Sequence, residues 1–576
     1  MKSNNTGTII KENKFTAFVR IIVGIFILTI MSILTMSAFL HTTGMEVIGE
    51  GEGCSTSLYF IQEALESVIY YNDSFISNII WLVLCLLICY TLMPLLNRLS
   101  LRTELILLSV IVIASGMIWV SSAQSAPSED SMMVTNASFE FAHNDFGRLT
   151  NPEERYFRNY SFQLGYVFFN EIIIRFRELF GKPENLLYLE RLNVLFLDAA
   201  YIGIMLITDM IFDDKRIRHM TGLFMVLAAA PIMFSTFLYG IIPGFCASVW
   251  SVFFLVKFLR ADKLKWKCIH GVACTALIAL AVMIKSNNLI VLVALCVMAA
   301  AGISAKKNLI TNGVLMIAAV VLSVSVSPAV KGMYESRSGV DLGDAVPFVS
   351  WFSMGLDESS NAPGWYNYVH TLRNFEESNF DADVAAEKSK EHIKERIKEF
   401  AQHPQYADDF FYKKFVSQWN ETSYQSIWTN RVRMHYAEYG KIANWVINEN
   451  EYTVKKLMDI FAQLIFFGAL AGSVFILRDK RLMAALFPLI IVGGVMYHLL
   501  AEAKSQYAIP YFILMFGFAA YGICGLYDRL PDNIKRIVKR FQFISEKKEP
   551  VTAPATTVAE DKKTEQPVKE AAPKNK

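Results

Sequence analysis

Residues 18–40 read FVRIIVGIFILTIMSILTMSAFL and contain one charged residue, Arg20. A bilayer core about 30 Å thick is crossed by a helix of roughly 20 apolar residues, so this run is long enough to span it. It is also too long for the core of a secretory signal peptide, and no small-residue cleavage site follows it. We therefore predict that the run is a retained membrane-spanning helix.

Comparable apolar segments recur along the chain. They begin near residues 76, 104, 191, 220, 242, 268, 288, 309, 457, 482 and 509. The 576 residues are 53% hydrophobic and 19% charged, with mean hydropathy +0.34, whereas soluble domains carry about 25% charged residues. The sequence thus predicts an all-α polytopic membrane protein of about 12 spans. The range is 11–13, because 164–180 is either a further span or, as its charges favour, an amphipathic surface helix.

Basic residues occupy every second loop between these segments. They cluster at 11–20, 98–102, 215–218, 260–267, 306–307, 478–481 and 529–540. Positively charged loops stay on the cytoplasmic side of a membrane. The pattern therefore predicts that both termini are cytoplasmic and that the intervening loops face outward.

The orientation divides the chain into regions. We predict a cytoplasmic N-terminus at 1–17, a transmembrane core at 18–326 with outer loops 41–75 and 122–187, an extracytoplasmic loop domain at 327–456, transmembrane helices at 457–527, and a basic, then disordered, cytoplasmic tail at 528–576. The loop domain is expected to be mainly helical, since Asp383–Gln402 has the pattern of a charged amphipathic helix. After about Lys547 the tail is rich in Pro, Ala, Lys, Glu and Thr, which leaves little to bury.

Candidate chemistry begins with the acidic pair Glu129 and Asp130, which lies about eight residues past the third predicted span. A carboxylate in an outward loop close to the membrane is suited to act as general base on a membrane-bound substrate. Two acids in a loop are also commonly just solvated, so the pair alone does not define a site. The eight cysteines show no spacing typical of a metal site or a disulfide framework.

A longer pattern surrounds this pair. It comprises Ser128-Glu129-Asp130, Ala137, Tyr160-Ser161-Phe162-Gln163-Leu164-Gly165 and Phe180-Gly181. Residues 127–181 thereby resemble the first outer loop of the bacterial multi-pass glycosyltransferases related to protein O-mannosyltransferases. The resemblance implies a C-type glycosyltransferase fold and a polyprenyl-phosphate-sugar donor. In the family an acidic residue of this loop is the presumed base, and the resemblance places it at Glu129. Family members commonly have Ser-Asp-Gln there, so Glu129 replaces the usual Asp and Asp130 stands where Gln is common, which leaves open whether Glu129 or Asp130 is the base. Ser161 also replaces a Pro of the family pattern.

Further positions match the same family more loosely. Tyr239 lies in a Leu-Tyr-Gly turn, and Lys285 lies in IKSNNLI at the outer end of the seventh span. Glu502, Lys504 and Tyr507 follow the eleventh span in HLLAEAKSQY. The resemblance implies that Lys285, with Lys504 or Arg148, binds the donor phosphate. An interfacial anchor for Lys285 and a structural ion pair for Glu502 and Lys504 are the alternatives.

The implied function is transfer of a hexose, with inversion, from a polyprenyl-phosphate-linked sugar to an acceptor hydroxyl on the extracytoplasmic face of a bacterial plasma membrane. The acceptor would be a cell-surface glycopolymer or protein, and no nucleic-acid partner is expected. The residues expected to contact substrate are Tyr160, Gln163, Tyr239, Glu502, Tyr507, Trp365 and Trp419. No cofactor or metal ligand is assigned, and the sequence leaves a divalent metal open.

Other classes of protein remain as alternatives. A transporter or lipid-linked glycan flippase would place charges within its spans and often shows internal repeats. Here the interiors of the predicted spans are nearly free of charge, apart from Asp198 and Asp209 in the fourth. A glycan polymerase would use related chemistry on a lipid-linked oligosaccharide, and a non-catalytic scaffold would fit a degenerate acidic motif.

Overall fold

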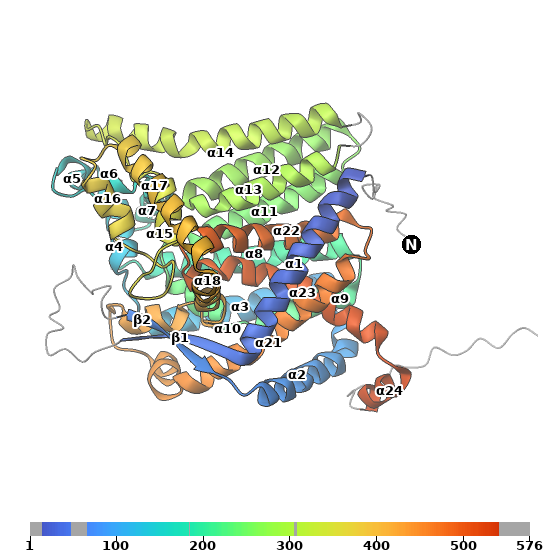
Figure 1. Ribbon diagram of the computed structural model, residues 1–576. Helices are drawn as coiled ribbons and strands as arrows, with labels where there is room; N and C mark the ends of the chain where they lie inside the picture. Colours follow the sequence, from blue (N-terminus) through green and yellow to red (C-terminus); the bar gives the residue numbers. More distant parts are fainter. Residues whose placement is uncertain (1–13, 48–65, 182, 184, 304–307, 541–576) are drawn as a thin grey trace, which may run out of the picture.

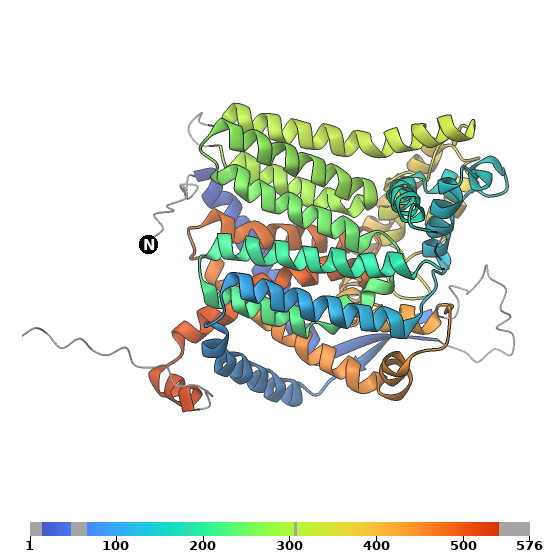
Figure 2. The same cartoon turned by 180° about the vertical axis from the view of Figure 1, so that it is seen from behind.

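A computed structural model describes residues 14–47, 66–181, 183, 185–303 and 308–540. All twelve predicted spans are helical within this part of the chain (Figures 1 and 2). Ten of the described helices are long and apolar enough to cross a membrane. They are α1 Lys14–Leu40, α2 Phe75–Leu96, α3 Leu101–Ala123, α8 Leu187–Phe212, α11 Ile241–Arg260, α12 Leu264–Ile284, α14 Leu309–Ser338, α21 Glu451–Ile476, α22 Leu486–Leu500 with the 3₁₀ turn Leu482–Ala485 before it, and α23 Ile509–Arg529. The predicted multi-pass helical membrane architecture is confirmed.

The two remaining predicted spans differ from straight membrane helices. The segment near residue 220 is a bent pair, α9 Lys215–Leu227 and a second piece over Ala229–Thr236, with 52° between them. Pro231 explains the break, because a proline ring clashes with the carbonyl four residues earlier, here that of Leu227. The segment near residue 288 forms α13 over Leu289–Ala301, which is only 13 residues long. Counting the bent pair as one span gives up to 11 within the described residues.

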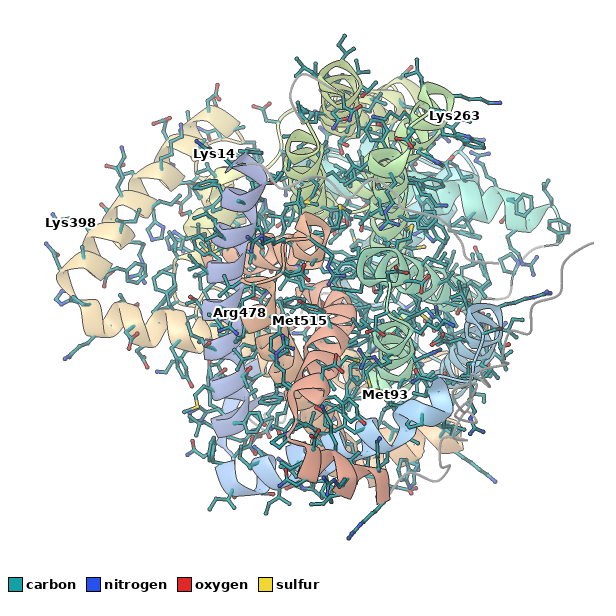
Figure 3. The ribbon with its side chains drawn as sticks, turned by 90° about the vertical axis from the view of Figure 1, so that its right-hand side faces the viewer. Lys14, Met93, Lys263, Lys398, Arg478 and Met515 are labelled. Carbon is teal, nitrogen blue, oxygen red and sulfur yellow. The ribbon has the colours of Figure 1, made fainter. Side chains whose placement is uncertain are left out.

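The helices run side by side, with different loops at their two ends (Figure 1). The described basic clusters lie at one end, called here the basic end. Figure 3 is viewed toward this end of the bundle and labels Lys14, Lys263 and Arg478. Here Arg20 connects α1 to the end of α21, since its Nη1 donates to the carbonyls of Ile476 (3.2 Å) and Leu477 (2.9 Å). Lys11, Lys306 and Lys307 lie outside the described residues, as does the tail after residue 540.

The opposite end, called here the loop end, carries the predicted outer loops. Loop 122–187 folds into α4 Glu129–Ala142, α5 Gly147–Thr150, α6 Tyr156–Asn159 and α7 Leu164–Glu178. The 327–456 region contains α15 Val349–Gly355, α16 Asn374–Glu376, α17 Ala382–Gln402, α18 Pro404–Trp419, α19 Ser426–Val432 and α20 Lys441–Asn444. The predicted amphipathic helices at 164–180 and 383–402 correspond to α7 and α17. The helix α14 continues past the expected boundary at 326 to Ser338.

Loop 41–75 adds a small sheet to the otherwise helical protein. The strands β1 His41–Val47 and β2 Glu66–Asn72 pair antiparallel, with His41 opposite Asn72. The Thr43 N–H donates to the Asn420 carbonyl at 3.2 Å, and the Val68 N–H donates to the Asn361 carbonyl at 3.0 Å. The sheet therefore joins the first outer loop to the 327–456 region.

Candidate active site

A cavity of about 680 Å³ opens at the loop end. Its walls come from the start of α4, the segment 156–163, the turn before α11, the end of α12, the 345–366 loop, α19 and the 497–507 segment. Ten of the residues predicted as functional line it: Glu129, Asp130, Tyr160, Gln163, Tyr239, Lys285, Trp365, Glu502, Lys504 and Tyr507. Residues almost 380 positions apart in sequence thus meet in one space.

Asp130 lies in the first turn of α4 and faces the cavity. The Tyr239 hydroxyl donates to Asp130 Oδ2 at 2.9 Å and accepts from Gln163 Nε2 at 2.5 Å. Burial, and secondly the negative charge of Asp130, raise the pKa of Tyr239 and Tyr156 well above the usual value. Both phenols therefore stay protonated and available as donors near the carboxylate.

Lys285 stands immediately after α12, where the chain turns extended. Its Nζ lies 3.6 Å from the centroid of the Tyr239 ring and 5.8 Å from that of Tyr507, a cation–π arrangement. Burial lowers the pKa of Lys285 to about 8, although Asp130 and Glu502 partly oppose this shift. The positive charge of Lys285 is therefore only partly compensated by its neighbours, and an anionic ligand would stabilise it.

Glu502 faces Lys285 from the 497–507 segment. Its Oε2 accepts from the Tyr507 hydroxyl at 3.3 Å. Burial raises the pKa of Glu502, and the charges of Lys504 and Lys285 oppose that shift. The segment is anchored from behind by Lys414 of α18, whose Nζ donates to the Ala501 carbonyl at 2.8 Å. No sequence motif marks Lys414.

Glu129 occupies a different part of the cavity from Asp130. Its backbone has a positive φ of 50°. Its charge interacts with the buried Arg433: burial lowers the pKa of Arg433 to about 10, and the charges of Glu190 and Glu129 partly oppose this shift. Arg433 stacks over the Phe237 ring at 4.2 Å and donates to the Thr236 carbonyl at 3.2 Å. This buried cavity arginine was missed by the sequence analysis, because no motif marks it.

Two predicted substrate or phosphate ligands lie outside the cavity wall. Arg148 forms a bidentate pair with Glu140 of α4, at 2.6 and 2.9 Å, and lies 3.9 Å from Glu154. Trp419 is 0% exposed and packs between other aromatic rings, 6.4 Å from Tyr511. The expectation that these two residues contact substrate therefore lacks support from the geometry, since one is paired at the surface of α4 and the other is buried.

Trp365 reaches the cavity wall but offers little of its ring. It is 1% exposed, and its indole N–H donates to Ser417 Oγ at 3.0 Å. Tyr366, the next residue, is only partly buried, and its hydroxyl lies 3.4 Å from that of Tyr160. On this wall, the tyrosines are thus better placed than Trp365 to contact a ligand.

A second, small cavity adjoins the first on the bundle side. It measures about 40 Å³ and shares Lys285, Asn287 and Tyr507 with the larger one. Its remaining walls are mostly apolar side chains of α11, α13, α22 and α23. The polar cavity and the apolar interior of the bundle thus meet at Lys285.

The large cavity is lined by the acidic side chains of Glu129, Asp130 and Glu502 and by His498. Among the described residues, the group of three or more histidine, cysteine or acidic side chains with donor atoms close enough for one ion is Asp357, His370 and His392, which does not line the cavity. In the cavity wall, Lys285 interacts electrostatically with the carboxylates of Asp130 and Glu502.

Comparison with known proteins found no matching family model and no matching curated protein. Among solved structures, the chain is similar to the oligosaccharyltransferase of Archaeoglobus fulgidus in its apo form, with 10% identity and a TM-score of 0.42, over 77% of this chain and 52% of that one. The oligosaccharyltransferase AglB from Archaeoglobus fulgidus, in complex with an inhibitory peptide and a dolichol-phosphate, matches with 11% identity, a TM-score of 0.42 and the same coverage. The chain spans about half the length of these structures. Because the sequence identity and the TM-score are this low, the function of this chain has to be inferred from its own cavity.

Proposed function

We propose that this protein is an integral membrane glycosyltransferase of the C-type fold that moves a hexose from a polyprenyl-phosphate carrier to an acceptor hydroxyl. The single observation that carries the proposal is the position of Lys285. It lies between a polar cavity containing Asp130 and a mostly apolar space among the helices. A lipid-linked sugar phosphate has this same division, with a sugar, an anionic phosphate and an apolar chain.

Asp130 is the base in the proposed reaction. Its carboxylate accepts the proton of the acceptor hydroxyl as the acceptor oxygen bonds to the anomeric carbon. The bond from that carbon to the phosphate oxygen breaks, and the lipid phosphate leaves with the electron pair. One displacement inverts the configuration at the anomeric carbon. The Tyr239 hydroxyl, 2.9 Å from Oδ2, orients Asp130 for this step.

Lys285 stabilises the leaving group. Negative charge on the departing phosphate grows during the reaction, and a cation already fixed beside it lowers the barrier without reorganising. The cavity also contains Lys504, which we assign to the same anion. Arg148 has no part in this assignment, because its guanidinium is paired with Glu140.

The surroundings of the reaction follow from the predicted orientation. The loop end would face outward from a bacterial plasma membrane, with both termini in the cytoplasm. The acceptor would be a cell-surface glycopolymer or protein that enters beneath the 327–456 region. The half-buried tyrosines Tyr160 and Tyr366 on that side would contact the sugar.

The function can be tested with purified full-length protein in detergent and radiolabelled undecaprenyl-phosphate hexoses. We expect one donor to release labelled sugar over time, with undecaprenyl phosphate as the second product. Lys285→Met should reduce this release by about 10²-fold or more, since removal of one preorganised donor to a developing charge has effects of that size. The matched control is Lys263→Met, an exposed lysine at the basic end.

Two results would argue against the proposal. If every donor stays intact in folded wild-type protein supplied with cell-envelope acceptors, the transferase assignment is wrong. If intact donor instead crosses the bilayer of reconstituted vesicles, the protein is a flippase, the alternative class.

A further inference from the structure

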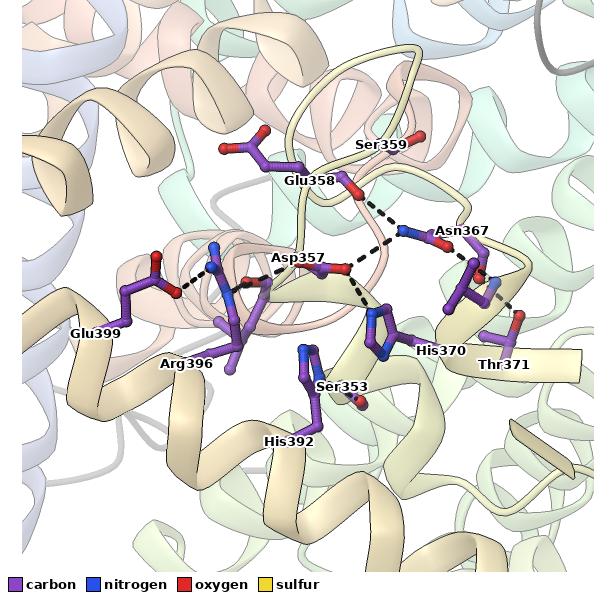
Figure 4. Close-up of polar contacts among 12 residues, drawn as sticks. Ser353, Asp357, Glu358, Ser359, Asn367, His370, Thr371, His392, Arg396 and Glu399 are labelled. Atoms are coloured by element: carbon purple, nitrogen blue, oxygen red, sulfur yellow. Dashed lines mark hydrogen bonds and ion pairs between the residues drawn. The ribbon is translucent and has the colours of Figure 1, made fainter. Parts of the chain in front are cut away.

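A second polar cluster lies in the 327–456 region, away from the cavity wall. Figure 4 shows its three central residues: Asp357 after α15, His370 in the π-helical turn Val369–Arg373, and His392 on α17. One donor atom from each lies within 4.8 Å of the others. His370 Nε2 is 2.7 Å from Asp357 Oδ2, and the two imidazole rings stack with centroids 3.8 Å apart and 13° between their planes.

The neighbours of the cluster hold its donor atoms in place. Ser353 Oγ lies 2.8 Å from His392 Nδ1, so a proton on Nδ1 leaves the lone pair of Nε2 for a ligand. Asn367 Nδ2 donates to Asp357 Oδ2 at 3.4 Å, and Arg396 Nε lies 3.9 Å from Oδ1. Such outer contacts are what orients histidine and carboxylate ligands in metal sites.

The positive charge of Arg396 would disfavour a nearby cation, but neighbouring groups compensate it. Its guanidinium forms an ion pair with Glu399 and donates to the Tyr406 hydroxyl at 2.9 Å. All three candidate ligands are half-buried, so that an ion can reach them from water.

We propose that Asp357, His370 and His392 form a binding site for a divalent zinc-class cation. Two imidazole nitrogens and one carboxylate oxygen make a three-ligand set that zinc accepts, with water completing the tetrahedron. Imidazole nitrogen selects zinc-class ions over magnesium or calcium, which prefer oxygen ligands throughout. The site is separate from the proposed transfer reaction.

The cation would fasten one wall of the cavity. Asp357 and His370 flank the 357–370 loop, which carries the cavity residues Trp365 and Tyr366, whereas His392 belongs to α17. An ion bound by all three joins this loop to α17. Zinc is thus expected to rigidify the part of the cavity wall that carries Trp365 and Tyr366.

The test uses full-length protein purified through a histidine-free tag, stripped with a chelator and titrated with Zn²⁺ alone. Calorimetry should show one equivalent bound, and Zn²⁺ should raise the melting temperature. His392→Ala and His370→Ala should abolish both effects. Ser353→Ala should weaken binding by about 10- to 100-fold, the range measured for outer-contact substitutions. The exposed His403→Ala in the same region is the matched control.

Asp130→Asn separates this site from the cavity and should leave zinc binding unchanged. If the histidine variants fail to fold, X-ray absorption at the zinc edge of loaded wild-type protein should show two imidazole nitrogens in the first coordination sphere. Absence of stoichiometric zinc in folded wild type would overturn the proposal. Binding lost in Asp130→Asn but retained in His392→Ala would also overturn it, by placing the ion in the cavity.

Discussion

The chain of contacts from Gln163 through Tyr239 to Asp130 fixes the position of the proposed base. Tyr239→Phe removes the hydroxyl between the other two residues but keeps the ring that Lys285 contacts. A hydrogen bond to a charged group contributes about 1.5–3 kcal/mol, so kcat/KM should fall by about 10- to 100-fold. Steady-state transfer kinetics measure this, with Tyr70→Phe as control, since Tyr70 donates to the Lys413 carbonyl outside the cavity wall. Equal activity in the two variants would remove Tyr239 from the mechanism.

The pH dependence of the reaction should report Lys285. Burial lowers the pKa of its ammonium group to about 8, so the charged form that binds phosphate dominates below that pH and is lost above it. We therefore expect kcat/KM, which reflects the free enzyme, to fall as pH rises through about 8. In Lys285→Arg the guanidinium stays protonated, and this alkaline decline should disappear. A decline at the same pH in both proteins would assign it to another group.

Much of this cavity could be predicted at the level of single residues, where a motif marks the end of a helix. Asp130, Lys285 and Glu502 each stand at such a junction, and the bundle brings these junctions together. The sequence could not predict that Arg148 pairs with Glu140, because that contact forms only when α4 and the following turn fold together. Arg433 could not be found, since its relevance arises only when the 327–456 region folds back over the turn that contains Thr236 and Phe237.

At the level of elements, close packing of α21 against α23 depends on glycine. A Cβ on Gly522 would lie 1.9 Å from the Gly468 carbonyl oxygen and 2.5 Å from the Gly472 nitrogen. Small residues at such spacing let membrane helices approach closely. We predict that Gly522→Ala destabilises the protein by about 1–3 kcal/mol, the usual cost of overpacking. Thermal unfolding in detergent measures the effect.

Gly313→Ala in α14 is the matched control for this packing, because nothing lies within 4 Å of a Cβ there. It should leave the melting temperature unchanged or slightly higher. If the two substitutions had the same effect, the contact between α21 and α23 would not be the cause. The sequence predicted that these helices exist, through their apolar length, but not which of their faces meet. The bend between α9 and the following piece was missed although Pro231 signals it.

At the scale of the whole molecule, the distribution of basic residues predicts the side on which the cavity opens. Lys398 of α17 and Lys263 beside α12 are both exposed. In Figure 1 the helix α17 lies at the loop end, whereas Lys263 immediately precedes the start of α12 at the basic end. In a cysteine-free background, Lys398→Cys should react with a membrane-impermeant maleimide on intact cells. Lys263→Cys should react only after permeabilisation. The reverse pattern would place the cavity in the cytoplasm and exclude an extracytoplasmic acceptor.

The central claim is that Asp130 acts as the base in sugar transfer from a lipid phosphate, and turnover of one donor by acid-to-amide variants tests it most directly. Asp130→Asn should lower the rate of sugar transfer from undecaprenyl-phosphate hexose by about 10²- to 10⁴-fold, the usual contribution of a general base. Glu129→Gln should have a smaller effect, and the exposed Glu153→Gln of the same loop should have none. Undiminished transfer by folded Asp130→Asn would contradict the account.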